Sequence, residues 1–227
     1  AAAKAVLEGP NQYAVTWGLA ELREAIAENL KSRYAPSFDW LDPDLHITIT
    51  CGVTEGIVAA LMAIAEPGDE VIIIEPAHEN YTPAVRFAGA EPVFVPADRE
   101  TGFLPDFASL PPEILARTAL AYYCSPANPQ GVIASKEVLA GLVALAREHD
   151  FVVASDECYS EIYDHDSAPP TGILEACRDL GGGLENVVVF NSLSKRSSCP
   201  GLRIGFVIGC LKDTYGLYED AEDLSVG

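Results

Sequence analysis

Seven short runs of apolar, largely β-branched residues recur along the sequence and constrain its fold more than any other feature. The runs are HITIT at 46–50, VIII at 71–74, PVFV at 92–95, ALAYY at 119–123, FVVAS at 151–155, VVVF at 187–190 and IGFVIG at 204–209. Most of them are apolar at consecutive positions, so both faces of each strand are expected to be buried. This pattern is typical of a parallel sheet that is covered on both sides.

Helical patterns separate several of these runs. Apolar residues recur at three- and four-residue spacing in 18–33, and helical patterns also occupy 54–65, 81–88 and 135–149. Ser135 is a suitable N-cap for the last of these helices, with a Glu close behind it. The alternation of strands and helices predicts an α/β fold, a three-layer α/β/α sandwich with a mainly parallel sheet.

Size and charge narrow the classes of partner. A chain of 227 residues can bury one good core, so one domain is expected. The chain carries 34 acidic and 14 basic residues and a formal net charge of -20, which repels nucleic acid and anionic lipid. No apolar stretch approaches the roughly 18 residues that a membrane span needs. We therefore expect a soluble protein without nucleic-acid or membrane partners.

The cysteines indicate a reducing compartment. Six are present, none in a C-x-x-C pair, and most lie in or beside apolar runs, which predicts small buried hydrophobic residues rather than disulfides or metal ligands. The first ten residues show no targeting segment. We expect a cytoplasmic protein without a metal site.

Polar residues follow four of the predicted strands, where ligands gather in sheets of this kind. Residues 51–56 form a glycine-bearing turn into a helix, whose free N–H groups and dipole can hold an anion, although plain turns of this type are common. Residues 124–131 form a loop with two prolines and a glycine that presents the amide of Asn128, and a tight turn is the simpler interpretation.

The other two strand ends carry charges. Asp156 ends a strand that is too apolar to contain a carboxylate without a partner, and a structural hydrogen bond is the alternative to a functional role. Lys195 follows the run at 187–190, and Arg203 precedes the last strand. Taken alone, Lys195 is more typical of a solvated loop lysine.

Together, the four strand ends resemble those of the class I/II aminotransferases, which depend on pyridoxal phosphate and have the aspartate-aminotransferase fold, also called fold type I. The similarity runs from Asn11 to Gly209, and its most specific part is S-x-S-K at 192–195 with an Arg eight residues after the Lys. Three segments are most similar to succinyldiaminopimelate aminotransferases: SPANPQG at 125–131, DECYSEIY at 156–163 and SLSKRSSCPGLR at 192–203.

The resemblance implies a division of the chain. Residues 13–210 correspond to the cofactor-binding large domain, 1–12 to a segment leading into it, and 211–227 to an acidic tail. The smaller C-terminal domain of the family, which carries the arginine that grips the substrate carboxylate, is missing, so the chain is expected to be a fragment.

The resemblance also assigns roles around the cofactor ring. Lys195 is the residue that would form the Schiff base and then move a proton between the substrate α-carbon and the cofactor C4′, for which its amine must be unprotonated. Asp156 would face the pyridine nitrogen and keep it protonated, so that the ring accepts electrons. Asn128 and Tyr159 would hydrogen-bond the phenolic oxygen of the ring, and Asn128 would also contact the substrate carboxylate.

By the same resemblance, the phosphate would be bound at the start of the helix predicted after residue 53. Its expected contacts are the backbone of Val53 and Thr54 and the side chains of Ser192, Ser194 and Arg203. Tyr13 matches the tyrosine that reaches the phosphate of the neighbouring subunit, which implies a homodimer; ordinary packing is its alternative role.

One position departs from the family pattern. Where the family places an aromatic ring that stacks on the cofactor, this chain has His78, which can also stack although over less area. Tyr81 is the alternative stacking residue, and ordinary solvation is the alternative state of His78.

Three functions fit these motifs. The leading one is transfer of an amino group from an amino acid to a 2-oxo acid. The second is a carbon–sulfur lyase reaction, because lyases of that kind share the same cofactor pocket. A truncated relative that binds cofactor without turnover is the third. Amino-acid biosynthesis is the expected context of the transferase.

Overall fold

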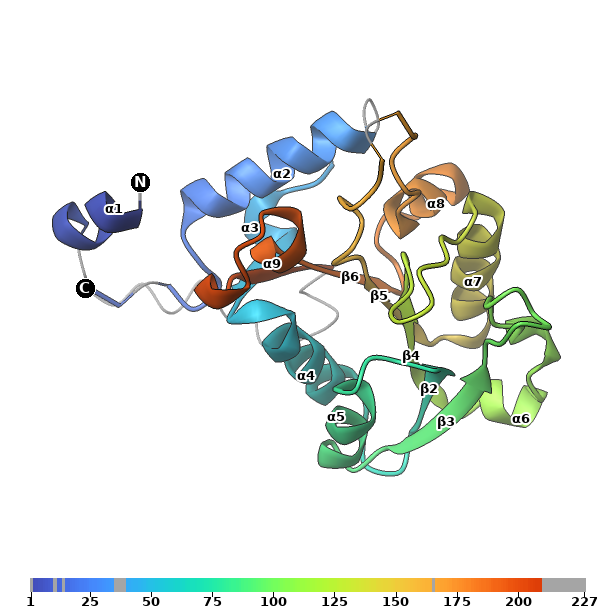
Figure 1. Cartoon of the computed structure of the whole chain (residues 1–227). Helices are drawn as coiled ribbons and strands as arrows, with labels where there is room; N and C mark the ends of the chain where they lie inside the picture. The colour runs from blue at the N-terminus through green and yellow to red at the C-terminus, as the bar shows by residue number, and fades with distance from the viewer. Residues whose placement is uncertain (1, 10–11, 14, 35–39, 165, 210–227) are drawn as a thin grey trace.

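The computed structural model describes residues 2–9, 12–13, 15–34, 40–164 and 166–209. A seven-stranded sheet runs through the middle of the molecule (Figure 1). Its strands are β1 (Ile47–Thr50), β2 (Glu70–Glu75), β3 (Glu91–Pro96), β4 (Thr118–Cys124), β5 (Val152–Asp156), β6 (Val187–Ser192) and β7 (Gly205–Ile208). The spatial order is β1-β7-β6-β5-β4-β2-β3, and only the pairs that involve β7 are antiparallel. All seven predicted strands are confirmed.

Helices cover both faces of this sheet and complete three layers (Figure 1). Helices α4 (Gly52–Ile64) and α5 (Tyr81–Phe87) pack on one face, and α2 (Ala20–Tyr34), α7 (Lys136–His149) and α8 (Ile173–Leu180) pack on the other. Shorter helical segments are α1 (Ala2–Glu8), α3 (Pro43–His46), η1 (Phe107–Ser109), α6 (Pro112–Leu115), α9 (Leu193–Arg196) and η2 (Pro200–Leu202). The predicted α/β/α sandwich with a mainly parallel sheet is confirmed.

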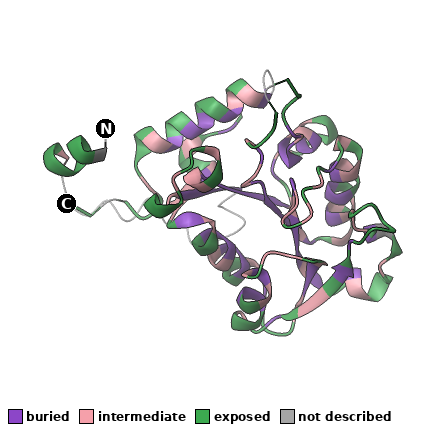
Figure 2. Cartoon of the chain, viewed as in Figure 1, coloured by how far each residue is buried: buried purple, intermediate pink, exposed green. Residues whose placement is uncertain are grey.

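Strand β2 explains why the apolar runs lack a polar face. Val71 and Ile73 pack toward α4 and α5, whereas Ile72 packs toward the opposite helical layer. All three side chains have no exposed surface. Because successive side chains of a strand point to opposite faces, a strand between two helical layers must be apolar at every position. Figure 2 shows the buried sheet between more exposed helices.

Helix α7 begins as the sequence predicts. Ser135 is its N-cap, and the Ser135 side chain accepts a hydrogen bond from the N–H of Val138 at 3.4 Å. Helix α4 begins two residues before the predicted start, because Gly52 adopts a φ of 74° and the turn into the helix closes there.

Some elements were not predicted from the sequence. Helix α8 is only eight residues long, and it packs Ile173, Leu174 and Cys177 against the core. Its apolar residues lie on one face, but eight residues are shorter than the window over which a helical period is recognised. The acidic tail predicted at 211–227 lies outside the described residues.

Among the cysteines that the structure describes, the prediction of small buried residues is right for Cys177 only, and Cys210 lies outside the described residues. Cys51 is exposed, and Cys124, Cys158 and Cys199 are half-buried; all five are free thiols. Cys124 and Cys158 are only half-buried because they lie at or just beyond the carboxyl ends of β4 and β5, where the sheet core gives way to loops.

Across the described ranges, no helix is both long and apolar enough to cross a bilayer.

Candidate functional site

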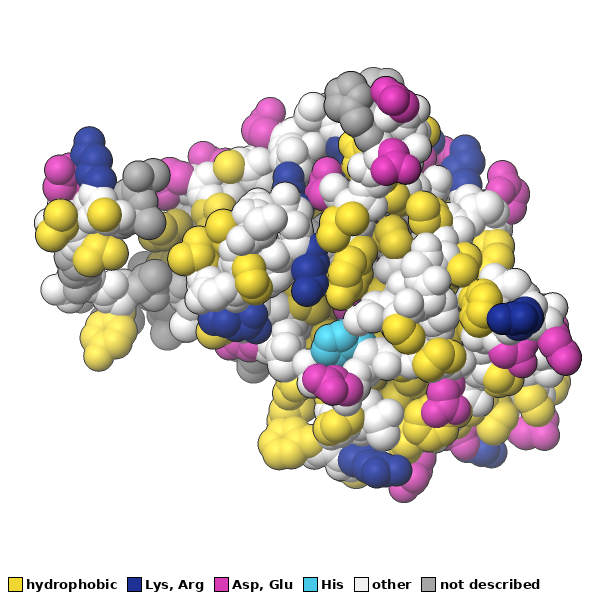
Figure 3. All heavy atoms as spheres, in the orientation of Figure 1, with side chains coloured by type: hydrophobic (Ala, Val, Ile, Leu, Met, Phe, Trp, Pro, Cys, Tyr) yellow, Lys and Arg dark blue, Asp and Glu magenta, His cyan; other side chains and the backbone are white. Residues whose placement is uncertain are grey.

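A pocket opens where β1, β5 and β6 end and β7 begins. Its lining residues come from five separate parts of the chain: Val53, Thr54, Ile57, His78, Asn80, Asp156, Cys158, Tyr159, Ser192, Ser194, Lys195, Pro200 and Arg203. The space-filling view shows a histidine and basic side chains on this face, between α4 and α9 (Figure 3). Nine of the candidate residues predicted from the sequence line this pocket: Val53, Thr54, His78, Asp156, Tyr159, Ser192, Ser194, Lys195 and Arg203.

Asp156 is the buried acid of this pocket. It is the last residue of β5 and is only 6% exposed. Its Oδ2 accepts a hydrogen bond from the hydroxyl of Tyr81 at 2.8 Å, and its Oδ1 accepts one from the N–H of Cys158 at 3.1 Å. The sequence analysis predicts that this carboxylate needs a partner, and the Tyr81 hydroxyl and the Cys158 N–H provide it.

Tyr81 is held in place as well. Its ring stacks on that of Tyr122, with centroids 4.5 Å apart and planes 2° from parallel. Burial, followed by the charge of Asp156, raises the pKa of Tyr81 well above its ordinary value. Tyr81 is 2% exposed, so its ring is not open to the pocket. Because its hydroxyl bonds Asp156 and one face is occupied by Tyr122, Tyr81 does not line this pocket, and its role as an alternative stacking residue stays a prediction.

Lys195 is one of the two basic residues of α9, with Arg196, and it lies close to Tyr159. Its Nζ lies 5.6 Å from the centroid of the Tyr159 ring, within the range of a cation–π contact. In the described ranges no acidic side chain forms an ion pair with Lys195. Burial, with the nearby Cys124 and Asp156, raises the pKa of Tyr159. The Lys195 amine thus projects beside a neutral aromatic ring rather than a carboxylate.

The start of α4 and Arg203 form a corner whose groups suit an anion. The first N–H groups of a helix have no intrahelical acceptor, and the helix dipole favours negative charge there. The guanidinium of Arg203 packs over Gly52, where an added Cβ would lie 2.3 Å from Nη2. On the other side, a Cβ on Gly205 would lie 2.7 Å from the N of Val53. Two glycines therefore allow Arg203 and β7 to approach this helix end closely.

Ser192 is fixed by several contacts at the end of β6. Its hydroxyl caps α9 by accepting a hydrogen bond from the N–H of Ser194 at 3.3 Å, and it lies 3.5 Å from the Sγ of Cys158. Its own N–H donates to the Oδ1 of Asn191 at 2.7 Å. The Asn191 amide also donates to the carbonyl oxygen of Glu157 at 3.0 Å, which ties the ends of β5 and β6 together.

His78 and Thr54 are linked through Asn80. The N–H of Asn80 donates to the Nδ1 of His78 at 3.3 Å, and the Asn80 amide donates to the Oγ1 of Thr54 at 3.4 Å. The ring of His78 is 5.8 Å from that of Tyr81 and tilted by 44°. Asn80 was missed by the sequence analysis, and its only signal was its place just before the helix that follows His78.

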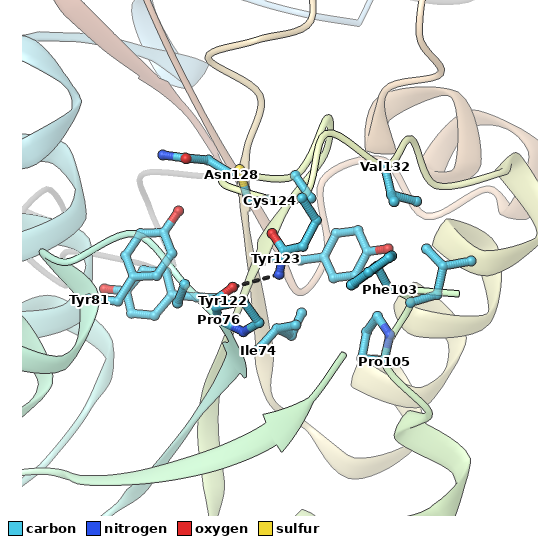
Figure 4. Close-up of a pocket in the computed structure, with 14 residues that line it drawn as sticks. Ile74, Pro76, Tyr81, Phe103, Pro105, Tyr122, Tyr123, Cys124, Asn128 and Val132 are labelled. Atoms are coloured by element: carbon cyan, nitrogen blue, oxygen red, sulfur yellow. Dashed lines mark hydrogen bonds between the residues drawn. The ribbon is translucent and has the colours of Figure 1, made fainter. Parts of the chain in front are cut away.

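Two predicted residues lie elsewhere. Asn128 does not line the pocket around Lys195; it lines a smaller one at the end of β4, one strand away from Asp156. Figure 4 shows this second pocket, with Tyr81 and Tyr122 overlapping on one side and Phe103 and Val132 on the other. Tyr13 is fully exposed, at 103% of the reference area, and lines neither pocket.

Glu157 is a second buried acid, on the opposite face of the sheet from Asp156. It accepts a hydrogen bond from the N–H of Ile173 at 2.7 Å, with longer ones from the hydroxyls of Ser155 and Tyr34 at 3.4 Å. Burial raises the pKa of Glu157 to about 7. The described residues contain no cluster of His, Cys, Asp and Glu suited to a metal ion.

Known proteins are similar to this chain in sequence and in fold. The model of the family "Aminotransferase class I and II" matches residues 2–215. An LL-diaminopimelate aminotransferase from Aquifex aeolicus is 35% identical over 210 residues, covering 92% of this chain and 52% of the relative. A probable N-succinyldiaminopimelate aminotransferase from Mycobacterium tuberculosis is 34% identical, covering 92% of this chain and 51% of the relative.

Solved structures of aminotransferases are also similar to this chain. An aminotransferase from Neisseria meningitidis has a TM-score of 0.83 and 35% identity, covering 92% of this chain and 53% of that chain. An aromatic aminotransferase from Pyrococcus horikoshii has a TM-score of 0.81 and 35% identity, covering 92% and 54%. The chain spans about half the length of the curated relatives it matches. On the extent of the family match, this chain belongs to the class I and II aminotransferases.

Proposed function

We propose that this chain is the cofactor-binding part of a pyridoxal-phosphate-dependent aminotransferase, which moves an amino group from an amino acid to a 2-oxo acid. One observation carries the proposal: an amine (Lys195), a buried carboxylate (Asp156) and a helix start with an arginine (Arg203) line one pocket. Pyridoxal phosphate has an aldehyde, a pyridine nitrogen and a phosphate, which require these three groups. The family match supports the same cofactor.

The phosphate would be bound at the start of α4. Val53 and Thr54 would donate backbone N–H groups, and Arg203 would add a charge-assisted hydrogen bond. The close approach of Arg203 to Gly52 supports this role, because the guanidinium already lies against the helix start. Ser192 and Ser194 line the same pocket and would supply hydroxyl donors.

The ring would lie between His78 and the end of β5. Asp156 would accept a hydrogen bond from the protonated pyridine nitrogen, and His78 would stack on the ring. When bound, the cofactor supplies an electron sink for the charge that develops at the substrate α-carbon. Tyr159 would hold the phenolic oxygen, and Asn128 would do so if its side chain turns from the neighbouring pocket toward this one.

Lys195 would hold the cofactor covalently and would then act as the base. Its Nζ would take the proton from the substrate α-carbon and return it at the cofactor C4′. The neighbouring Tyr159 ring supports this role, since it orients the side chain without a competing carboxylate. Removal of the amine should therefore abolish turnover while leaving the phosphate and ring contacts intact.

The substrate, the assembly and the compartment are further parts of the proposal. The names of the two relatives make diaminopimelate and its N-succinyl derivative the first amino donors to assay, in line with a role in amino-acid biosynthesis.

The full exposure of Tyr13 supports a homodimer in which this side chain reaches the phosphate of a second copy. A cytoplasmic location stays a prediction.

The direct test is the absorbance spectrum of the purified chain with pyridoxal phosphate, before and after borohydride reduction. Wild type should gain a visible band, and reduction should fix the cofactor to the peptide that contains Lys195. Lys195→Ala should lose both signals. Lys136→Ala is the matched control, because Lys136 on α7 pairs with Asp179 of α8 outside the pocket, and this variant should behave as wild type.

Addition of an amino acid alone then separates the reactions. A transaminase stops after one amino group per site and needs a 2-oxo acid to continue, whereas a carbon–sulfur lyase releases ammonia repeatedly. Repeated ammonia release would contradict the transferase proposal. A reducible cofactor without either reaction would favour a non-catalytic, cofactor-binding chain.

A further inference from the structure

We propose that Tyr81 is a positioning residue that fixes Asp156 against the cofactor ring, and that its stack on Tyr122 couples this carboxylate to helix α4. The inference rests on the proposed cofactor site but adds a residue that does not touch the cofactor. It follows from a continuous set of contacts that starts at Asp156 and ends in the backbone of α4.

The first contacts fix the orientation of the Asp156 carboxylate. The hydroxyl of Tyr81 donates to the Oδ2 of Asp156 at 2.8 Å, and the N–H of Cys158 donates to Oδ1 at 3.1 Å. With one donor on each oxygen, the carboxylate plane cannot rotate without losing a buried hydrogen bond. A carboxylate that must meet a ring nitrogen in one direction requires such support, because small misplacements weaken a hydrogen bond steeply.

The second contact holds Tyr81 itself. Its ring lies parallel to that of Tyr122 with centroids 4.5 Å apart, and both rings are buried. The hydroxyl of Tyr122 donates to the carbonyl oxygen of Ile57 in α4 at 3.1 Å. Helix α4 also provides the proposed phosphate contacts at Val53 and Thr54. The same set of contacts therefore relates the two ends of the cofactor pocket.

The surroundings of the Tyr81 hydroxyl also favour the protonated phenol, which is the form that donates a hydrogen bond. Burial and the neighbouring acidic groups, Asp156, Cys124 and Cys158, raise the pKa of Tyr81 well above its ordinary value. A tyrosinate next to Asp156 would be repelled, whereas the neutral phenol donates a hydrogen bond to Oδ2. The position thus suits a hydrogen-bond donor rather than a proton carrier.

Tyr81→Phe and Tyr122→Phe form a matched pair for the test. Each removes one hydroxyl and keeps the stacked rings, but only Tyr81→Phe removes a donor from Asp156. The chain is loaded with pyridoxal phosphate, and the dissociation constant and the pH midpoint of the visible band are measured. We expect Tyr81→Phe to weaken cofactor binding by roughly 3- to 10-fold. We expect its pH midpoint to shift in the same direction as in Asp156→Asn, but by less, with Tyr122→Phe close to wild type.

A double-mutant cycle separates positioning from general packing. In an Asp156→Asn background, Tyr81→Phe should have little further effect on cofactor binding, because the group it positions has already been changed. Fully additive effects would overturn the proposal, as would a Tyr81→Phe variant with the spectrum and affinity of Tyr122→Phe. If wild type itself shows no visible band, the cofactor site is wrong and the inference fails with it.

A label that keeps the ring and its hydroxyl covers the case in which Tyr81→Phe does not fold. Fluorotyrosine placed at position 81 should show a fluorine resonance that shifts when pyridoxal phosphate is added, and this shift should shrink in Asp156→Asn. The same label at position 122 should respond less. An unchanged resonance at position 81 in cofactor-loaded protein would overturn the proposal.

Discussion

Arg203 and Gly52 fit each other so closely that position 52 has no room for a side chain. A Cβ at Gly52 would lie 2.3 Å from Nη2 of Arg203 and 2.8 Å from its Cζ. The φ of Gly52 is 74°, which L-residues adopt only with strain. The proposed phosphate site therefore depends on a glycine that makes no contact with phosphate through a side chain.

Gly52→Ala should displace the Arg203 guanidinium and weaken the binding of pyridoxal phosphate by roughly tenfold. It should also destabilise the chain by about 1 kcal/mol because of the positive φ. Cofactor titration and urea unfolding measure the two effects. Gly141→Ala is the control, since a Cβ there would meet open space in α7 and should improve helix stability slightly. Equal cofactor affinity in Gly52→Ala and wild type would contradict the proposed role of Arg203.

Glu157 should make stability fall as the pH rises. Its pKa is raised from 4.5 to about 7 by burial, so the folded state retains a proton that the unfolded state has lost between these values. The part of the free energy of unfolding that is linked to this proton is fully present below about pH 4.5 and is lost as the pH rises through 7. The whole loss is on the order of 3 kcal/mol.

Glu157→Gln removes this titration, because the amide stays neutral and its oxygen still accepts from the N–H of Ile173. Urea unfolding at pH 5 and pH 8 should show a smaller loss of stability in the variant than in wild type. Glu148→Gln changes an exposed carboxyl of α7 and should leave the wild-type difference unchanged. An equal loss of stability between pH 5 and pH 8 in wild type and in Glu157→Gln would contradict a raised pKa of Glu157.

Gly172 lies against the buried acid as well. A Cβ there would be 2.2 Å from the hydroxyl oxygen of Tyr34 and 2.8 Å from Oε2 of Glu157. Gly172→Ala should destabilise the chain by about 1–3 kcal/mol through overpacking. Adding Tyr34→Phe removes the nearest atom and should recover part of that loss in urea unfolding. A double variant no more stable than Gly172→Ala would place the strain elsewhere.

The thiols should react in an order set by their surroundings. Cys51 is exposed and should be alkylated first by iodoacetamide in the folded chain. Cys177 is buried, and burial raises its pKa to about 12, so it should react only after unfolding. Mass spectrometry of peptides after brief alkylation measures this order. Early modification of Cys177 in folded protein would contradict the packing of α8.

The strands were predictable because the side chains of each apolar run are buried on both faces of the sheet. Asp156 and Glu157 show where this reasoning stops: the sequence identified Asp156 as a site residue, but its neighbour on the other face of the sheet attracted no prediction. The hydrogen bond from Tyr81 to Asp156 joins residues 75 positions apart. Periodicity describes neighbours within one element, so it carries no information on such a pair.

Strand β7 has a consequence for the order in which the molecule can be completed. In the described part of the chain, β1 pairs with β7 alone, and Gly205 at the start of β7 lies against the first residues of α4. During synthesis, the ribosome must therefore deliver β2 to β6 and then β7 before β1 has this partner. The corner that faces the proposed phosphate is thus made of early and late residues, and it cannot form before β7 has been synthesised.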